Sequence, residues 1–219
     1  MITTLLTAVS GISGVLPHLI TMLGPAFYLI LFLIIFCETG LVFAPFLPGD
    51  SILFLCGSFA ASANYHLNIF ILLGTLIIAA NLGDNVNFWI GEKFGKHILS
   101  HPKWKKLIKP EYLKKANNFF NKYGSLAIFL GRFIPIIRTV VPFTAGLGKM
   151  EPQKFRKFNL LGGTTWVSIA LLSGFFLGNV PFVKDHIELL MLLIVVVSLI
   201  PVVITFIKNR IERSHRNVK

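Results

Sequence analysis

The sequence predicts an all-α polytopic membrane protein with an inverted-repeat-like arrangement: two opposed re-entrant hairpins set between transmembrane helices. Three observations support this fold class. The chain of 219 residues is 54% hydrophobic and only 14% charged, with a mean hydropathy of +0.74, whereas soluble domains carry about 25% charged residues. Several apolar segments are long enough to cross a bilayer. Two further apolar segments, 25–63 and 125–148, are interrupted by proline and glycine and contain ionisable residues.

The first element, residues 1–24, is mildly apolar and fits either a transmembrane span or a helix lying on the membrane surface. It has no basic segment of the kind that precedes the apolar core of a cleavable signal peptide. We therefore expect it to be retained.

The distribution of basic residues orients the chain. Residues 1–92 contain no Lys or Arg, and all 21 basic residues follow them. These residues fall mainly between apolar segments and at the C-terminus, where the positive-inside rule places cytoplasmic charge. This pattern explains the basic composition without a nucleic-acid partner. It predicts a cytoplasmic loop over 93–122 and a cytoplasmic C-terminal tail over 208–219.

Three spans follow from length and flanking charge. Residues 67–90 should descend to the cytoplasmic loop, and 158–180 and 187–207 should form an antiparallel hairpin with an outward-facing link. Within the loop, Pro110 and Glu111 suit the start of an amphipathic helix on the membrane surface. The C-terminus is then cytoplasmic.

The two broken segments are predicted to be re-entrant. Basic residues flank 125–148 on both sides, so this segment starts and ends in the cytoplasm and cannot be a single span. The segment 25–63 is predicted to be its outward-opening counterpart. Broken backbone at membrane depth is tolerated only where it packs in protein or lines a watery cavity, as in inverted-repeat transporters. The residues expected to break the two hairpins are Pro45, Pro48, Gly49, Pro135, Pro142 and Gly146.

Five ionisable residues lie in the predicted membrane segments, where an ionisable side chain costs roughly 2.5–3.5 kcal/mol at the bilayer centre. Four of them are in the two broken hairpins, and the fifth, Asp84, is in the span 67–90. The outward-opening hairpin has the acids Glu38 and Asp50, and the inward-opening hairpin has Arg132 and Arg138. A pair of arginines suits recognition of an anionic headgroup, because the guanidinium fork matches phosphate oxygens. Buried acids can take up and release protons, which assigns Glu38 and Asp50 to proton coupling or gating. Two alternatives stay open: buried ion pairs that only lock the hairpins together, and simple helix capping by Asp50.

Asp84 lies in a polar stretch with three asparagines, which fits either an inter-helix hydrogen-bond network or a supporting role at the site. Cys37 and Cys56 sit in apolar surroundings and are interpreted as small hydrophobes. No pattern of metal ligands, nucleophile or cofactor-binding loop accompanies the charges. We therefore predict no metal, no cofactor and no enzyme.

Several blocks of the sequence resemble the DedA family, also called the SNARE-associated or VTT-domain family. They are Phe36-Cys37-Glu38-Thr39-Gly40-Leu41, Pro45-Phe46-Leu47-Pro48-Gly49-Asp50-Ser51, Gly83-Asp84, and Gly131-Arg132-Phe133-Ile134-Pro135-Ile136-Ile137-Arg138-Thr139, followed by Pro142, Ala145-Gly146, Asn159 and Trp166. The resemblance covers about 25–207. It implies a bacterial inner-membrane protein with two facing re-entrant hairpins, whose essential acids and arginines map onto Glu38, Asp50, Arg132 and Arg138. Asn159 enters as a supporting polar residue.

Four functions follow as hypotheses. The resemblance favours a proton-motive-force-dependent flippase for undecaprenyl phosphate or a similar lipid phosphate, which would support cell-envelope homeostasis. A general flippase or scramblase for phosphatidylethanolamine presents the same phosphate chemistry. A proton-coupled antiporter for small solutes or cations would need the acids but not both arginines. A structural membrane partner would need the charges only for stability. The expected partners are membrane lipids and protons, and Gly174-x-x-x-Gly178 fits packing within the chain or in a homo-oligomer.

Overall fold

The computed structural model describes residues 18–41, 49–100, 110–178 and 180, and all regular secondary structure in these ranges is helical. The labelled helices are α2 (Ala26–Gly40), α3 (Gly49–Ala60), the short 3₁₀ helix η1 (Ala63–Tyr65), α4 (Ile69–Ser100), α6 (Pro110–Tyr123), α7 (Leu126–Gly131), α8 (Pro135–Leu147) and α9 (Pro152–Leu177). Residues 18–23 are helical as well. The predicted span 187–207, the tail 208–219 and the hairpin-breaking Pro45 and Pro48 lie outside the described residues.

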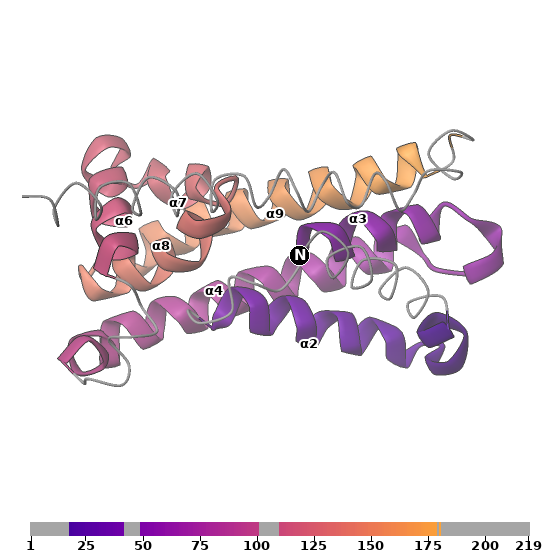
Figure 1. The fold of residues 1–219 in the computed structure, drawn as a ribbon, viewed down its shortest axis with the longest axis horizontal. Coiled ribbons are helices and arrows are strands. Elements are labelled where there is room, and N and C mark those ends of the chain that lie inside the picture. The colour runs from indigo at the N-terminus through magenta and orange to yellow at the C-terminus, as the bar shows by residue number, and fades with distance from the viewer. Residues whose placement is uncertain (1–17, 42–48, 101–109, 179, 181–219) are drawn as a thin grey trace, which may run out of the picture.

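Two long helices run the length of the molecule, and the short helices gather at its two ends (Figure 1). α4 and α9 are long and apolar enough to cross a membrane. α2 and α3 flank one end of this pair, whereas α6, α7 and α8 lie at the other. All-helical secondary structure with two long apolar helices is therefore confirmed for the described residues. That the short helices are re-entrant in a bilayer stays a prediction.

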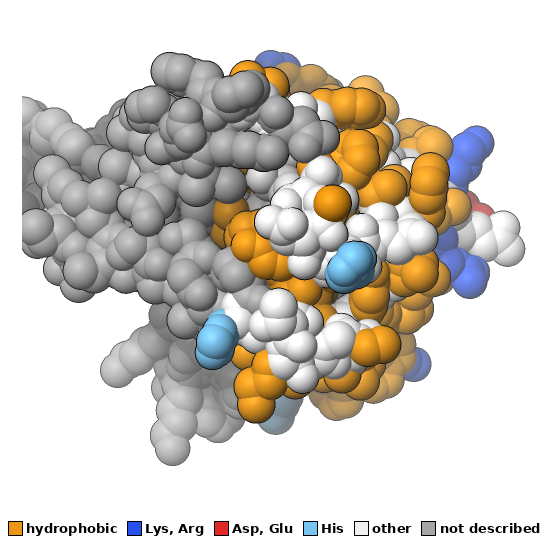
Figure 2. All heavy atoms as spheres, turned by 90° about the vertical axis from the view of Figure 1, so that its right-hand side faces the viewer, with side chains coloured by type: hydrophobic (Ala, Val, Ile, Leu, Met, Phe, Trp, Pro, Cys, Tyr) orange, Lys and Arg blue, Asp and Glu red, His pale blue; other side chains and the backbone are white. Residues whose placement is uncertain are grey.

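Charge is distributed unevenly along this long axis. Apart from Arg132 and Arg138, the described basic residues belong to the end of α4, to α6, and to the stretch from the end of α8 into α9, which all lie at one end of the molecule. Viewed from the opposite end, the described surface shows hydrophobic side chains around backbone and polar atoms, with histidines in front and Lys and Arg side chains only at the margin (Figure 2). This polarity is the one that the positive-inside rule requires if the α6 end faces the cytoplasm.

Two helices extend beyond the spans expected from hydropathy. α4 continues to Ser100, so the first part of the predicted loop 93–122 is helical, and α6 occupies its last part. α9 begins at Pro152, six residues before the predicted span. Polar residues end the apolar part of a helix without ending its hydrogen bonding. Pro152 marks the true start because proline is favoured in the first turn of a helix.

The two arms of each broken segment pack on different long helices. α2 packs on α4 and α3 packs on α9, while α7 packs on α9 and α8 on α4. Glycines allow the closest approaches, because a Cβ at Gly57 would collide with the Leu171 carbonyl oxygen and one at Gly174 with that of Phe54. The α4–α8 contact repeats this reciprocal arrangement, with Gly91 against Phe143 and Gly146 against Phe88.

The helix contacts give the two halves of the chain a register that differs from their shared sequence motif. The motif Pro-Phe-x-x-Gly occurs at Pro45-Phe46-x-x-Gly49 and again at Pro142-Phe143-x-x-Gly146. The helix contacts instead make Phe143-x-x-Gly146 of α8 the counterpart of Phe54-x-x-Gly57 of α3. Pro142 and Gly146 lie inside α8 and do not break it. A proline in a helix interior removes one backbone hydrogen bond, which packed membrane helices accommodate. Pro135 begins α8 directly after the break, and Gly49 is the first residue of α3.

The glycine contacts predict a sharp contrast between two chemically identical substitutions. Gly174→Ala is expected to lower the free energy of unfolding by about 1–3 kcal/mol, because the new methyl group overlaps the Phe54 carbonyl. Gly74→Ala is the matched control, since nothing lies within 4 Å of a Cβ there. Thermal unfolding of the purified protein in detergent measures both. Equal melting temperatures for the two variants would contradict the close α3–α9 contact at Gly174.

Candidate functional site

Five buried or half-buried charged residues meet where the ends of four short helices converge. Glu38 lies in the last turn of α2 and Asp50 in the first turn of α3. Arg132 follows the last residue of α7, and Arg138 lies in the first turn of α8. Asp84 comes from the middle of α4. The two broken segments therefore bring their charges together, although the sequence separates the acids from the arginines by about 100 residues.

Arg138 is held by two carboxylates at once. Its Nη2 donates to Oε1 of Glu38 at 2.7 Å, and its Nη1 donates to Oδ1 of Asp50 at 2.8 Å. The Arg138 and Glu38 side chains are 8% and 1% exposed, whereas that of Asp50 is 26% exposed. Each charge-assisted bond uses a different guanidinium nitrogen, so the arginine bridges α2 and α3.

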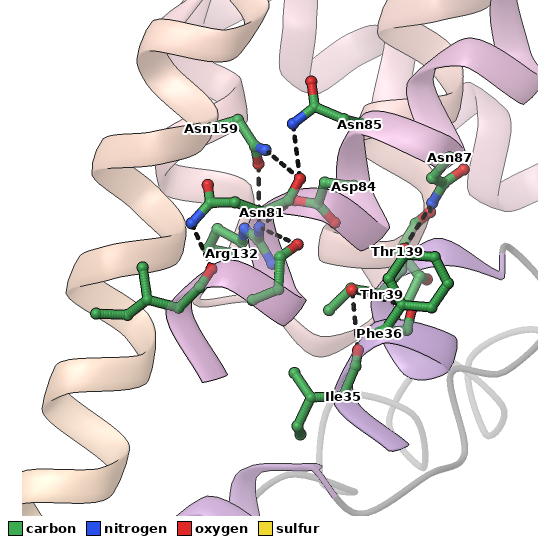
Figure 3. Close-up of polar contacts among 12 residues, drawn as sticks. Ile35, Phe36, Thr39, Asn81, Asp84, Asn85, Asn87, Arg132, Thr139 and Asn159 are labelled. Carbon is green, nitrogen blue, oxygen red and sulfur yellow. Dashed lines mark hydrogen bonds and ion pairs between the residues drawn. The ribbon is translucent and has the colours of Figure 1, made fainter. Parts of the chain in front are cut away.

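Arg132 is the centre of a second network, shown in Figure 3. Its Nη2 forms an ion pair with Oδ2 of Asp84 and donates to Oδ1 of Asn159 at 3.0 Å. The Asn159 amide in turn donates to the backbone carbonyl of Asn81. Arg132 and Asp84 side chains are each 2% exposed, which makes this the more deeply buried pair. The structure thus places Asn159 in contact with a predicted site residue.

Trp166 of α9 joins the two networks. Its indole Nε1 donates to Oδ1 of Asp50 at 2.8 Å, and the guanidinium carbons of Arg138 and Arg132 lie 5.0 and 5.7 Å from the indole ring centre. Both distances are within the range of cation–π attraction. Sequence reasoning did not assign Trp166 to the site. The available signal was its position two helical turns after Asn159, on the same face of α9.

Asn87 of α4 is a second residue at the site that the sequence analysis did not assign to it. Its side-chain amide donates to the backbone carbonyls of Thr39 and Thr139, at 3.1 and 2.9 Å (Figure 3). Thr39 directly follows Glu38, and Thr139 directly follows Arg138. Asn87 is completely buried, so it fixes the backbone beside both members of that ion pair.

Glycines bring backbone up against the charged groups. A Cβ at Gly49 would overlap the Glu38 carboxylate, and one at Gly163 would press on the Asn81 amide and the Arg132 guanidinium. Gly49 belongs to the first turn of α3, so the Glu38 carboxylate lies beside the start of that helix. Because the first-turn amides of a helix carry partial positive charge, this placement favours a carboxylate there.

The cluster contains two guanidinium groups and three carboxyl groups, and each guanidinium already contacts at least one carboxylate. An incoming anion would therefore compete with a carboxylate at each arginine, although the Nε of Arg132 has no hydrogen-bond partner. The arrangement agrees with both interpretations of the charges, an anion-binding site and a structural lock between the hairpins. The ion pairs join the short helices, and they also occupy the arginines that would bind an anion.

Within the described ranges, no group of three or more His, Cys, Asp or Glu side chains is placed to hold a metal ion. Cys37 and Cys56 are both free thiols, and Cys56 is buried. Gly174 and Gly178 both pack against α3, so the GxxxG spacing of α9 is used within the chain.

Comparison with known proteins gives consistent results. Residues 47–176 match the family described as the VTT domain. The chain is 43% identical over 195 residues to "Protein DedA" of Escherichia coli (strain K12), which covers 89% of both chains. It is 39% identical to "Uncharacterized membrane protein Rv0364" of Mycobacterium tuberculosis (84% of this chain, 80% of the relative). It is 34% identical to "Inner membrane protein YghB" of Salmonella typhimurium (78% and 74%). No solved structure matches the chain significantly.

Proposed function

The chain belongs to the DedA family of VTT-domain membrane proteins, and from this premise we propose that it is an inner-membrane flippase for lipid phosphates. Undecaprenyl phosphate or a similar lipid phosphate would be its substrate. The headgroup would bind to Arg132 and Arg138, while the acyl or prenyl tail follows through the surrounding lipid. Membrane location is supported by the names of two relatives, one called a membrane protein and the other an inner membrane protein.

The observation that carries this proposal is the pair of buried guanidiniums that both lie within cation–π distance of Trp166. Arg132 and Arg138 are 2% and 8% exposed and lie between short helices that approach from opposite ends of the molecule. A buried arginine stays charged and offers several donors in a plane, which suits the oxygens of a phosphate. A site midway between the two ends is where a flippase must hold its headgroup.

The three carboxyl groups supply a reason for proton coupling. A phosphate that enters the cluster adds negative charge beside Glu38, Asp50 and Asp84 in a medium that solvates charge poorly. Protonation of a displaced carboxyl group offsets that charge. Binding of the headgroup and uptake of protons therefore favour each other, and proton motive force can drive transfer.

The decisive experiment is leaflet transfer of a labelled lipid phosphate by the protein reconstituted in vesicles. Arg132→Ala and Arg138→Ala should each slow transfer about 30-fold or more, since loss of one partner of a buried charged contact costs about 2–5 kcal/mol. Glu38→Gln should uncouple transfer from the proton gradient. Arg156→Ala is the control, because Arg156 is an exposed arginine near the start of α9.

Three outcomes would contradict parts of this proposal. Unchanged transfer by folded arginine variants excludes the phosphate clamp. Equal transfer with and without a proton gradient or membrane potential excludes proton driving. Faster transfer of labelled phosphatidylethanolamine than of the polyprenyl phosphate would assign the protein to general phospholipid movement. A cation antiporter fits the site less well, because every acid of the cluster contacts an arginine.

A further inference from the structure

The described helices around the site pack as two bodies. α2 and α8 lie against α4, and we call these three helices the α4 body; α3 and α7 lie against α9, and these form the α9 body. Within each body, glycines bring the backbones into direct contact, as at Gly146 against Phe88 and at Gly174 against Phe54. α3 has few contacts with α4, and the two bodies meet mainly along the seam between α4 and α9.

Some polar contacts of the site stay inside one body. In the α4 body, Arg138 pairs with Glu38, and Asn87 ties the backbone next to each of them to α4. In the α9 body, Arg132 donates to Asn159, and Trp166 donates to Asp50. Each arginine thus has one partner that would move with it.

The other ion pairs cross the seam. Arg138 of the α4 body binds Asp50 of the α9 body, and Arg132 of the α9 body binds Asp84 of the α4 body. The two ion pairs are reciprocal, because each body contributes one arginine and one aspartate to the pairs that cross the seam. Further polar contacts across the seam run from Arg132 and Asn159 to backbone carbonyls of α4.

We propose that the phosphate group inserts at this seam, where its oxygens replace Asp50 on Arg138 and Asp84 on Arg132 as the two bodies part. This inference rests on the proposed function and assigns different roles to the acids. Asp50 and Asp84 are the exchangeable partners, whereas Glu38 stays on Arg138 and Asn159 on Arg132. Asn87 is a positioning residue that acts through the backbone beside Glu38 and Arg138. The greater exposure of Asp50, 26% against 1% for Glu38, agrees with its exchange, whereas Asp84 is 2% exposed and becomes accessible only when the two bodies part.

Disulfide locking tests whether the bodies must part. In a Cys37→Ala/Cys56→Ala background, Asn81→Cys with Gly163→Cys places one thiol on each side of the seam, since a Cβ at Gly163 lies 2.9 Å from the Asn81 amide nitrogen. The matched control is Gly95→Cys with Leu147→Cys, which joins α4 to α8 inside one body. The Cβ atoms of this control pair are 3.5 Å apart, within the range for a disulfide.

We expect oxidation of the seam pair to reduce transfer of labelled lipid phosphate at least 10-fold, with recovery after reduction. The oxidised control pair should stay within 2-fold of its reduced form. The inference is overturned if the oxidised seam pair transfers at the reduced rate, or if the control disulfide inhibits transfer equally.

A binding measurement keeps the inference separate from the proposed function. With Trp89→Phe and Trp104→Phe, Trp166 is the only tryptophan, and displacement of Asp50 from its indole should shift its emission. Inorganic phosphate and a short-chain prenyl phosphate serve as probes.

The outcomes of this measurement differ between the two redox states of the seam pair. A shift with prenyl phosphate that occurs in the reduced pair and is absent after oxidation supports insertion at the seam, even if no lipid transfer is detected. An equal shift in both redox states overturns it, as does no shift in either. A shift with inorganic phosphate alone contradicts a lipid headgroup as the ligand.

Discussion

Replacing Arg132 with leucine is expected to lower the free energy of unfolding by about 3–5 kcal/mol. Asp84 would be left as a buried carboxylate without a cation, and an uncompensated buried charge costs about that much. Both side chains are 2% exposed, so water cannot take the place of the lost partner. Thermal unfolding in detergent measures the loss, and Arg156→Leu provides the exposed control.

The double variant Arg132→Leu/Asp84→Leu separates stability from transport. Replacing a whole buried ion pair with apolar side chains of similar size is often neutral. We therefore expect the double variant to regain most of the lost stability and yet to remain inactive in leaflet transfer. If it transfers lipid phosphate at the wild-type rate, the Arg132–Asp84 pair is structural and the phosphate clamp is excluded.

Gly49→Ala is the second change expected to have a large effect. The added methyl group would overlap the Glu38 carboxylate and push it away from Arg138, although the substitution adds no charge and removes no donor. A displacement of about 1 Å at a functional group can cost about 100-fold in rate, and we expect transfer to fall by about that factor. The melting temperature should also drop, because overpacking costs about 1–3 kcal/mol.

Gly74→Ala is again the control, since a Cβ at Gly74 meets no atom within 4 Å and alanine favours the helix there. Transfer by this variant should equal that of the unmodified protein. Normal transfer by Gly49→Ala would show that Glu38 need not hold its observed position against Arg138.

The sequence predicts those features that depend on neighbouring residues alone, such as membrane spans, charges in apolar segments and helix starts. Hydropathy and length identify α4 and α9, because every backbone polar group in a bilayer must be satisfied within its own helix. The cost of charge in lipid singles out Glu38 and Arg138 without any knowledge of their neighbours. Pro135 marks the start of α8 because its fixed backbone suits the first turn of a helix.

The features that could not be predicted depend on contacts between distant segments. By composition alone, Trp166 is one more apolar residue of a span, and only the fold brings both guanidiniums within about 6 Å of its ring. Pro142 carries the same local signal as Pro135 but lies inside α8, where packing against α4 holds the helix together. Arg138 and Glu38 are 100 positions apart in the sequence, and no periodic pattern of residues predicts that they pair.

The crossed packing of the short helices has a consequence for how the protein is made. α3 is complete at Ala60, but its partner α9 begins only at Pro152. At about 5–20 residues per second, a ribosome needs on the order of ten seconds to reach the end of α9. During that time the face of α3 around Gly57 and Asp50 has no permanent partner, so the nascent chain depends on the insertion machinery or on surrounding lipid to shelter it. The first half of the repeat thus cannot finish folding until most of the second half has been synthesised.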